Sequence, residues 1–467
     1  MAQNNGTAPR IVWFRRDLRL ADQPALFAAA ASGGPVIPVY VLDDDTPGNH
    51  AMGGASRWWL HHSLESLSVS LGRHRSKLVL RRGNAAREIA KLVKETSACE
   101  VHAVRHYEPW WRKAQGVLAK EVELVLHDGN YLLPPGMVTT GSGEPYKIYT
   151  PFAKAARQCL PHREVLDEPS FSSPGEWPRS DALGDWNLLP AKPDWASRFG
   201  KSWDVGEQAA HAQIDDFADR VKDYDGDRNL PSLDGSSRLS PHLHFGEISP
   251  AQVWDRLSRH RGEGADTYRG ELLWRDYAQN VICQFPGYPT QSYRDYDNSL
   301  WRNPNRGHLI AEELEAWQQG RTGYPIVDAG MRQLWATGWM HNRVRMIAAS
   351  FLVKHLLIDW RHGERWFWDT LVDADYGNNG VNWQWISGTG VDSNMFVRIM
   401  APLSQSEKFD AGGYIREWVP ELANLSDGQI HDPDEDCRPS EYPAKIIGHK
   451  EARERALSAY REMKAAS

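Results

Sequence analysis

The chain has 467 residues, too many for one ordinary core, so we expect two domains of roughly 100 to 250 residues each. A hydrophobic fraction of 41% with 25% charged residues is typical of a soluble globular protein, and no apolar run is long enough to span a membrane. The N-terminal sequence MAQNNGTAPR lacks the apolar core of a signal peptide, and the four cysteines form no CxxC motif. We therefore expect a cytoplasmic protein with free thiols and no metal site.

The net charge of −7 argues against a chain that binds polyanions through its overall field. The charge is not uniform, however. Between residues 321 and 362 there are six Lys or Arg residues and two Asp residues, which gives +4 by subtraction. Such a segment can contact phosphates, although a solvated surface is the commoner role of a charge run.

The first 130 residues alternate short β-branched runs with helical patterns. The runs RIVWF, GPVIPVYVL, SKLVLR, EVHAV and VELVLH each fit a buried strand, whereas RWWLHHSLESLSVSLGRH and NAAREIAKLVKET have helical spacing of apolar residues. This order predicts an α/β domain over residues 1–130 with a doubly wound, Rossmann-like parallel sheet. No G-x-G-x-x-G motif follows the first strand, so a nucleotide is expected elsewhere.

The rest of the chain changes character twice. Residues 131–205 are rich in proline, glycine, serine and tryptophan, which predicts a long, partly packed connector. From residue 206 to 467 the patterns are mostly helical, most clearly over 329–360, and predict an all-helical second domain.

Two segments combine groups that suit a phosphate or a polar ligand. Residues 234–250, DGSSRLSPHLHFGEISP, place Gly235 and three serines around Arg238 before a helical pattern, which fits either a pyrophosphate site or a plain N-cap. In GELLWRDYAQN, Glu271 and Trp274 are three residues apart and share a helix face. An ordinary surface pair between Glu271 and Arg275 would also explain this spacing.

Two further segments interleave aromatic rings with polar groups. GWMHNRVRM, residues 338–346, alternates bulky and hydrogen-bonding side chains, which suits a flat heterocycle beside a phosphate. DADYGNNGVNWQW, residues 373–385, holds two acids, a series of amides and two indoles, which suits a planar redox-active ring. A turn with Asx hydrogen bonds ahead of a core tryptophan is the simpler alternative.

Five motifs together resemble the photolyase/cryptochrome family: IVWFRRDLRLADQPAL, GSSRLSPHL, ELLWRDY, GYPIVDAGMRQLWATGWMHNRVRM, and DADYGNNGVNWQWISGTG followed by SEKFD. Their order and spacing agree from about residue 10 to 460. Within the family the pattern is similar to bacterial photolyases that act on cyclobutane pyrimidine dimers (CPDs). The resemblance implies light-dependent repair of UV-damaged DNA, in which excited, fully reduced FAD gives an electron to a flipped-out dimer.

The resemblance also implies roles for individual residues in the helical domain. Tyr224 and the turn Ser236, Ser237, Arg238, Leu239 and Ser240 would hold the FAD phosphates and ribityl chain. Asp373, Ala374 and Asp375 would line the flavin side, with Arg345 paired to Asp373 and Asn379 beside flavin N5. Asn at this position is typical of dimer photolyases, whereas plant cryptochromes tend to carry Asp.

Electron transfer and lesion binding are assigned in the same way. Trp383 would begin a chain of electron donors that continues through Trp360 to Trp301, with Trp317 as the alternative outer residue. Trp274 and Trp385 would clamp the dimer, and Glu271 would bond to its carbonyl side. The remaining DNA contacts implied are Arg228, Asn342, Arg343, Met346 and Gln405.

The chain departs from the family pattern in three places. Gln23 and Pro24 stand where relatives often have Asn, and GVNWQW replaces a more usual double glycine before the tryptophan. Trp110 and Trp111 stand where folate-binding relatives show Asn and Glu. The antenna chromophore is therefore open among a folate (MTHF), an 8-hydroxydeazaflavin and none, and we favour the folate.

Two alternatives keep the family but change the function. A cryptochrome-like blue-light sensor would signal rather than repair, and Asn379 argues against it. A photolyase for the (6-4) photoproduct would use a histidine pair, for which His341 is the candidate. A non-catalytic DNA-binding module leaves the aspartates and tryptophans unexplained. We expect a monomeric enzyme.

Overall fold

The computed structural model of the chain describes residues 8–294, 296, 300–393, 396 and 398–466. The first seven residues, on which the expectation about a signal peptide depends, lie outside the described residues. The chain forms two compact units. Unit 1 comprises Met1–Asp194, Trp203–Val221 and Ser237–Pro286, and unit 2 comprises Trp195–Ser202, Lys222–Ser236 and Gly287–Ser467. The boundaries predicted at residues 130 and 205 stay predictions.

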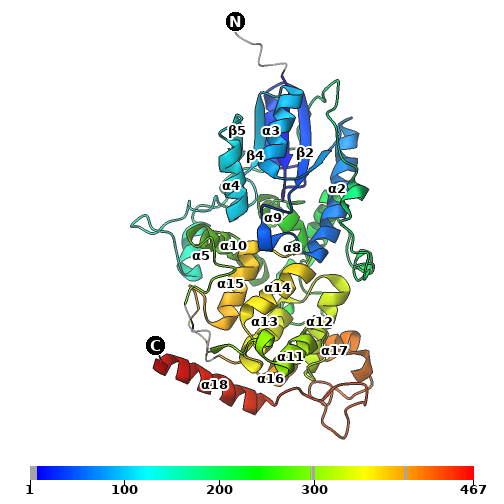
Figure 1. The fold of residues 1–467 in the computed structure, drawn as a ribbon, viewed down its shortest axis with the longest axis vertical. Coiled ribbons are helices and arrows are strands. Elements are labelled where there is room, and N and C mark those ends of the chain that lie inside the picture. Colours follow the sequence, from blue (N-terminus) through cyan, green and yellow to red (C-terminus); the bar gives the residue numbers. More distant parts are fainter. Residues whose placement is uncertain (1–7, 295, 297–299, 394–395, 397, 467) are drawn as a thin grey trace. The chain divides into compact units, whose positions relative to one another are not determined.

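Unit 1 contains a five-stranded parallel sheet in the order β3-β2-β1-β4-β5 (Figure 1). The strands are β1 (Arg10–Phe14), β2 (Val36–Leu42), β3 (Val79–Arg82), β4 (Glu100–Val104) and β5 (Leu124–His127). Each of the five apolar runs forms one strand, so the predicted doubly wound sheet is confirmed. The order reverses between β1 and β4, which is the point where ligands of such sheets usually bind.

The sheet is covered on both faces. Ile11 and Trp13 of β1 pack in one buried cluster with Ile89 of α3 (Ala85–Thr96) and Leu118 of α4 (Pro109–Leu118). The alternate residues of the strands are buried as well, since Val12 has no exposed surface. Burial on both faces explains why β1 and β2, which are buried throughout, are continuous apolar runs instead of alternating ones.

The other helices of unit 1 are α1 (Pro24–Ala31), α2 (Gly54–Arg73), α5 (Tyr149–Arg157), α6 (Glu207–Arg220), α8 (Ser240–Phe245), α9 (Pro250–Arg256) and α10 (Glu263–Gln284). Unit 2 contains α7 (Tyr224–Asp227), α11 (His308–Gln318), α12 (Pro325–Thr337), α13 (Asn342–Ser350), α14 (Trp360–Thr370), α15 (Tyr376–Ser387), α16 (Pro402–Lys408), α17 (Gly412–Trp418) and α18 (His449–Ala466). Together with the sheet, these helices confirm the predicted fold class.

The clearest helical pattern of the sequence, residues 329–360, is not one helix. Gly338 ends α12 in the left-handed region at φ +69°, which a residue without Cβ adopts readily. Phe351–His355 form a π-helical turn after α13, and Ile358 then makes a parallel β-bridge with Arg302. These interruptions divide the pattern into α12, α13 and a separate π-helical turn.

The described residues include no helix that is both long and apolar enough to cross a membrane. The four cysteines, Cys99, Cys159, Cys283 and Cys437, are free thiols.

Candidate active site

A bidentate ion pair joins α13 to the turn before α15 in unit 2. Arg345 Nη1 and Nη2 donate to the two carboxylate oxygens of Asp373 at 3.2 and 2.9 Å, and Arg345 Nε donates to the Met340 carbonyl at 2.7 Å. The Asp373 side chain is only 5% exposed, so its charge needs the guanidinium beside it. The predicted pair is therefore present, while its place beside a flavin stays a prediction.

The second aspartate of this motif caps a helix. Asp375 is the N-cap of α15, and its Oδ1 accepts from the backbone N–H of Asn378 at 2.7 Å and from Asn378 Nδ2 at 3.0 Å. Ala374, between the two acids, is buried. The turn with Asx hydrogen bonds is thus present, and a cofactor role for Asp375 stays a prediction.

Asn379 is buried on the first turn of α15. Its Nδ2 donates to the Glu364 carbonyl oxygen at 3.1 Å and to Glu364 Oε1 at 3.0 Å. Both partners are acceptors, so only the amide nitrogen can face them. The side-chain oxygen of Asn379 is thereby directed away from Glu364, as an acceptor for a donor on the other side.

The serine-rich segment has no regular secondary structure before α8, and its residues up to Ser236 belong to unit 2, whereas those from Ser237 belong to unit 1. Gly235, in unit 2, has no room for a side chain, because a Cβ there would lie 2.5 Å from the Asp227 carbonyl oxygen. In unit 1, Ser237 Oγ accepts from Tyr268 Oη at 3.0 Å and from the Leu239 N–H at 3.3 Å. Helix α8 starts at Ser240 with no side-chain cap, so the plain N-cap reading is wrong.

The other residues of this segment are also ordered. Arg238 has a left-handed backbone at φ +52°, and its guanidinium lies 4.7 Å from the ring of Trp203. Ser236 is half-buried. In unit 2, Tyr224 begins α7 with 7% exposure, and the Arg228 guanidinium lies 5.3 Å from its ring.

The predicted electron donors lie in the interior of unit 2. Trp383 and Trp360 are 2% and 0% exposed, and Trp360 Nε1 donates to Ser292 Oγ at 3.2 Å. Gly363 of α14 lets the helix approach Trp383, because a Cβ there would lie 2.1 Å from the indole. The position of Trp383 therefore depends on α14.

The two candidates for the outer tryptophan differ in access to solvent. Trp301 lines a surface pocket of about 340 Å³ with Asp359 and His362, which flank Trp360 in sequence. Trp317 is fully buried, lies 6.4 Å from Trp383 between ring centroids, and donates its Nε1 to the Ala348 carbonyl. Trp301, with 9% of its surface exposed against 0% for Trp317, is therefore the more accessible of the two.

Trp383 and Trp385 lie on opposite sides of α15. Residues two apart on a helix are separated by about 200°. Trp383 is therefore buried, whereas Trp385 is half-buried. This difference gives the two indoles of one motif different surroundings.

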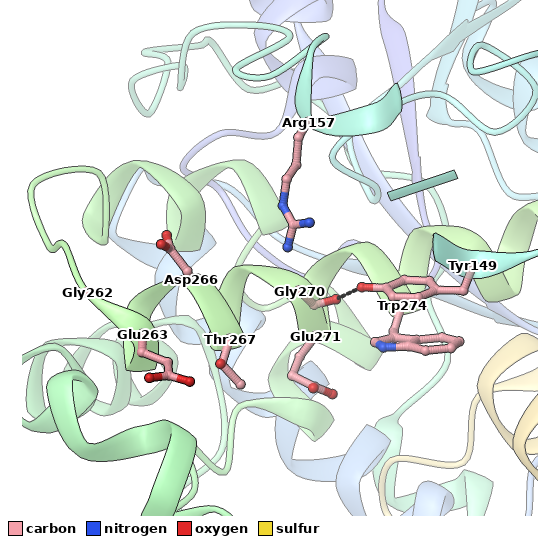
Figure 2. A pocket seen from close by; sticks show the side chains of 9 residues that line it. All are labelled: Tyr149, Arg157, Gly262, Glu263, Asp266, Thr267, Gly270, Glu271 and Trp274. Carbon is pink, nitrogen blue, oxygen red and sulfur yellow. Dashed lines mark hydrogen bonds between the residues drawn. The ribbon is translucent and has the colours of Figure 1, made fainter. Parts of the chain in front are cut away.

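In unit 1, Glu271 and Trp274 of α10 line an open pocket of about 610 Å³ (Figure 2). Tyr149 and Arg157, at the two ends of α5, complete its wall with the first two turns of α10. The Arg275 guanidinium donates to the carbonyl oxygens of Asn130 and Leu243. The predicted pair of Glu271 and Trp274 thus shares one pocket.

The predicted DNA contacts on α13 are close to one another. Asn342 is exposed at the first helical position, and Arg343 Nη1 lies 3.7 Å from the sulfur of Met346. Arg343 also donates to Asn229 Oδ1. Gln405, on α16, is half-buried. All four belong to unit 2.

His341 precedes these residues and is 3% exposed. Its Nδ1 accepts from the Arg343 N–H at 3.3 Å and so caps α13. Burial, together with the positive charges of Arg343, Arg345 and Arg228, lowers the pKa of His341 to about 4. The side chain is neutral near pH 7, which does not suit a proton-donating histidine.

The basic stretch from 321 to 362 is largely neutralised. Three of its arginines are ion-paired: Arg332 with Glu421, Arg345 with Asp373 and Arg361 with Asp359. Lys354 has no exposed surface, and burial lowers its pKa well below the usual value. Counting charges therefore overstated the accessible positive surface.

The departures near the N-terminus have structural explanations. Gln23 caps α1, since its Oε1 accepts from the Ala25 N–H at 2.9 Å. Trp110 is 8% exposed and stacks on His50 with 6.2 Å between ring centroids. Trp111 is half-buried and packs edge-to-face on Trp13 at 5.9 Å.

Two family models match the chain. Residues 10–170 match the model described as DNA photolyase, and residues 268–462 match the FAD binding domain of DNA photolyase. The deoxyribodipyrimidine photo-lyase of Agrobacterium fabrum is 45% identical to this chain and covers 98% of both sequences. The chain belongs to the photolyase/cryptochrome family. The predicted family is therefore confirmed, as is the prediction of an enzyme, a photo-lyase.

Solved structures of photolyases have the same fold. A bacterial class III photolyase from Agrobacterium tumefaciens is 44% identical, covers 98% of both chains and superposes with a TM-score of 0.91. An archaeal photolyase from Sulfolobus tokodaii, solved with two FAD molecules, is 30% identical over 97% of this chain and 100% of that chain, with a TM-score of 0.82.

The cofactor of this photolyase domain is FAD, and the residues present fit it. A buried carboxylate neutralised by Arg345 and the acceptor oxygen of Asn379 provide polar groups for a flavin ring. In unit 1, the hydroxyl of the buried Ser237 would suit a phosphate. The positions of these groups against FAD stay predictions.

Sequence reasoning missed three residues of the site. Glu364 orients Asn379, Gly363 makes room for Trp383, and Tyr149 packs on Trp274. Gly363 and Glu364 follow Trp360 within one helix, so their proximity to that donor was a usable signal. Tyr149 lies in the supposed connector, where no periodicity pointed to a function.

Proposed function

We propose that the chain repairs cyclobutane pyrimidine dimers in DNA by a light-driven electron transfer. When bound, reduced FAD would supply, on excitation by light, an electron that returns to it once the cyclobutane ring has opened, so repair consumes no reductant. The protein residues must bind the dimer after it leaves the DNA stack and exclude water from it. They must also balance the charge of the reduced flavin. The observation that carries the proposal is the pocket of unit 1, in which a carboxylate and an indole are presented together.

Glu271 and Trp274 would act on the dimer directly. Their spacing of three residues places both side chains on one face of α10. Trp274 would stack on one pyrimidine, since stacking of a base on an aromatic ring contributes about 1–3 kcal/mol to the binding free energy. The Glu271 carboxylate would accept a hydrogen bond from the thymine N–H group on the carbonyl side of the base, and such buried polar contacts give specificity.

In unit 2, Trp385 would provide a second aromatic contact and Met346 an apolar one. Arg228, Asn342, Arg343 and Gln405 would bind the DNA strand around the lesion. Because the stretch from 321 to 362 is largely ion-paired, these few contacts must provide the affinity for phosphates.

Trp383, Trp360 and Trp301 would deliver electrons to oxidised FAD. Trp301 is supported as the outer member by its place in a surface pocket, where a positive charge can be solvated or lose a proton. Trp317 is fully buried and lacks such an exit.

For the antenna we propose a folate that stacks on an indole of α4, with an 8-hydroxydeazaflavin or no antenna as the competing outcomes. Mass spectrometry of the chromophores released from purified protein decides among them. We also propose a cytoplasmic monomer, for which size-exclusion chromatography with light scattering is the measurement.

The test of repair uses a purified oligonucleotide that carries one thymine dimer. Recovery of thymine absorbance under blue light, with reduced FAD and a dark control, is the expected result. A second oligonucleotide with a (6-4) photoproduct should show no recovery, because the buried neutral His341 is unsuited to proton donation. No recovery with either lesion would favour the cryptochrome-like sensor.

A further inference from the structure

The indole of Trp274 is not a free side chain in its pocket. The ring of Tyr149 lies parallel to it, with 3.4 Å between ring centroids and 7° between planes. Aromatic pairs usually have centroids 4.5–7 Å apart in offset or edge-to-face arrangements, so this overlap is unusually complete. Tyr149 thus packs face to face on Trp274.

A hydrogen bond of Tyr149 and the packing of a third ring, Tyr277, fix the stack of Tyr149 on Trp274. Tyr149 Oη donates to the Gly270 carbonyl oxygen at 2.8 Å (Figure 2). Tyr277, which is fully buried, packs edge-on against both rings at 5.6 and 5.7 Å and donates its hydroxyl to the Lys147 carbonyl at 2.7 Å. Gly270, Trp274 and Tyr277 are spaced i, i+4 and i+7, so one face of α10 fixes the start of α5.

Tyr149 and Trp274 are both half-buried and line the same open pocket as Glu271. Two rings that served only the core would be as fully buried as Tyr277. In Figure 2 the Glu271 carboxylate lies on the side of Trp274 that faces away from Tyr149. The second face of the half-buried indole is therefore on the same side as the carboxylate.

We infer that Tyr149 is a positioning residue for the substrate: it holds the plane of Trp274 so that the second face is ready to stack on a pyrimidine of the lesion. This inference rests on the proposed function. A free indole would have to be ordered when the dimer binds, and each side chain immobilised on binding weakens affinity by a factor of about 2 to 10. Tyr149 makes that ordering part of folding.

The test compares Tyr149→Leu with Tyr149→Phe in the full-length, FAD-loaded enzyme. Binding of dimer-containing and undamaged oligonucleotides is measured in the dark, and KM and kcat of repair are measured in the light. Tyr149→Leu should weaken dimer binding and raise KM by about five- to tenfold, with little change in kcat at saturation. Tyr149→Phe, which keeps the stack but loses the bond to Gly270, should remain within about twofold of wild type.

The control is Phe171→Leu, which removes a half-buried ring that stacks on His74 with 5.1 Å between ring centroids and does not line this pocket, and which should leave dimer binding unchanged. FAD content and thermal unfolding show whether each variant folds, and Tyr149→Met replaces Tyr149→Leu if the latter does not. Unchanged dimer binding in both aliphatic variants would overturn the inference, as would equal losses in the Phe and Leu variants.

If wild type prefers dimer DNA in the dark but does not repair it, the proposed function fails while the binding comparison still decides the role of Tyr149. If wild type shows no preference for dimer DNA, both fail.

Discussion

Asp276 gives the stability of unit 1 a pH dependence that can be measured. The side chain is fully buried on α10, and its two oxygens accept from the backbone N–H groups of Leu132 and Leu133 at 3.2 and 2.9 Å. Burial disfavours the charged carboxylate more than these bonds and Arg275 favour it, so the pKa of Asp276 is raised to about 7. The segment after β5 is thereby attached to the helix that carries Glu271.

The sign and the size of the effect follow from linkage. In the unfolded chain the carboxyl loses its proton near pH 4, whereas the folded protein keeps the proton until about pH 7. Between these values the folded state binds the extra proton, so its stability falls as pH rises. At about 1.4 kcal/mol per pH unit, the loss from pH 5.5 to 7 is about 2 kcal/mol, with a plateau above pH 7.

The assay is urea unfolding of FAD-loaded protein, followed by circular dichroism from pH 5.5 to 8.5. Asp276→Asn cannot titrate, so its stability should fall by about 2 kcal/mol less than that of wild type over this range. Glu207, whose pKa burial also raises to about 7, supplies part of the slope that remains. Asp266→Asn on the same helix, where the aspartate side chain is 73% exposed, is the matched control and should keep the wild-type slope.

Equal slopes for wild type and Asp276→Asn would refute the reasoning, because they would mean that Asp276 is already ionised in the folded protein at pH 5.5. A variant that falls more steeply than wild type would reverse the sign of the argument. The variant also differs from wild type in stability by an amount that does not depend on pH. The Asn side chain keeps only one of the two acceptor oxygens, which lowers the free energy of unfolding by about 1–3 kcal/mol at every pH. This constant difference does not affect the comparison of slopes.

Three further predictions concern the site. Glu271→Ala should lower the repair rate at least tenfold while FAD stays bound, and a repair rate equal to wild type in single-turnover flashes would remove its assigned role. Trp383→Phe should abolish light-driven reduction of oxidised FAD, yet leave repair intact when the flavin is reduced chemically beforehand; persistent photoreduction, followed by absorbance, would point to another donor. Arg345→Met leaves the buried Asp373 carboxylate unpaired at a cost of about 3–5 kcal/mol, so the purified variant should lose FAD, and Arg345→Met with Asp373→Asn should regain part of it. Full FAD content in the single variant would contradict the charge-pairing argument.

Local patterns were sufficient for much of the fold. Each of the five apolar runs became a strand, because a strand buried on both faces needs a continuous apolar segment and little else. The pair Glu271 and Trp274 was also predictable, since residues three apart on a helix share a face whatever surrounds it. The pairing of Arg345 with Asp373, 28 residues apart, came from the family resemblance and not from spacing.

Other features depended on contacts between distant segments. Counting charges gave the stretch from 321 to 362 a net charge of +4, but Arg332 is neutralised by Glu421 of another element. The helical pattern over 329–360 did not show where Gly338 would end a helix, because an apolar period continues through a break in the backbone. Neither partner choice nor chain direction is encoded in a local period.

The sequence by itself determined the family, the strand and helix content, and the helix face shared by Glu271 and Trp274, because these follow from residue type and short-range spacing. Only the tertiary structure decided that Glu364 orients Asn379, that Gly363 admits Trp383, and that a tyrosine from the supposed connector covers one face of Trp274. The physical reason is that burial, ion pairing and ring stacking are set by residues that are far apart in the chain and meet only when it folds.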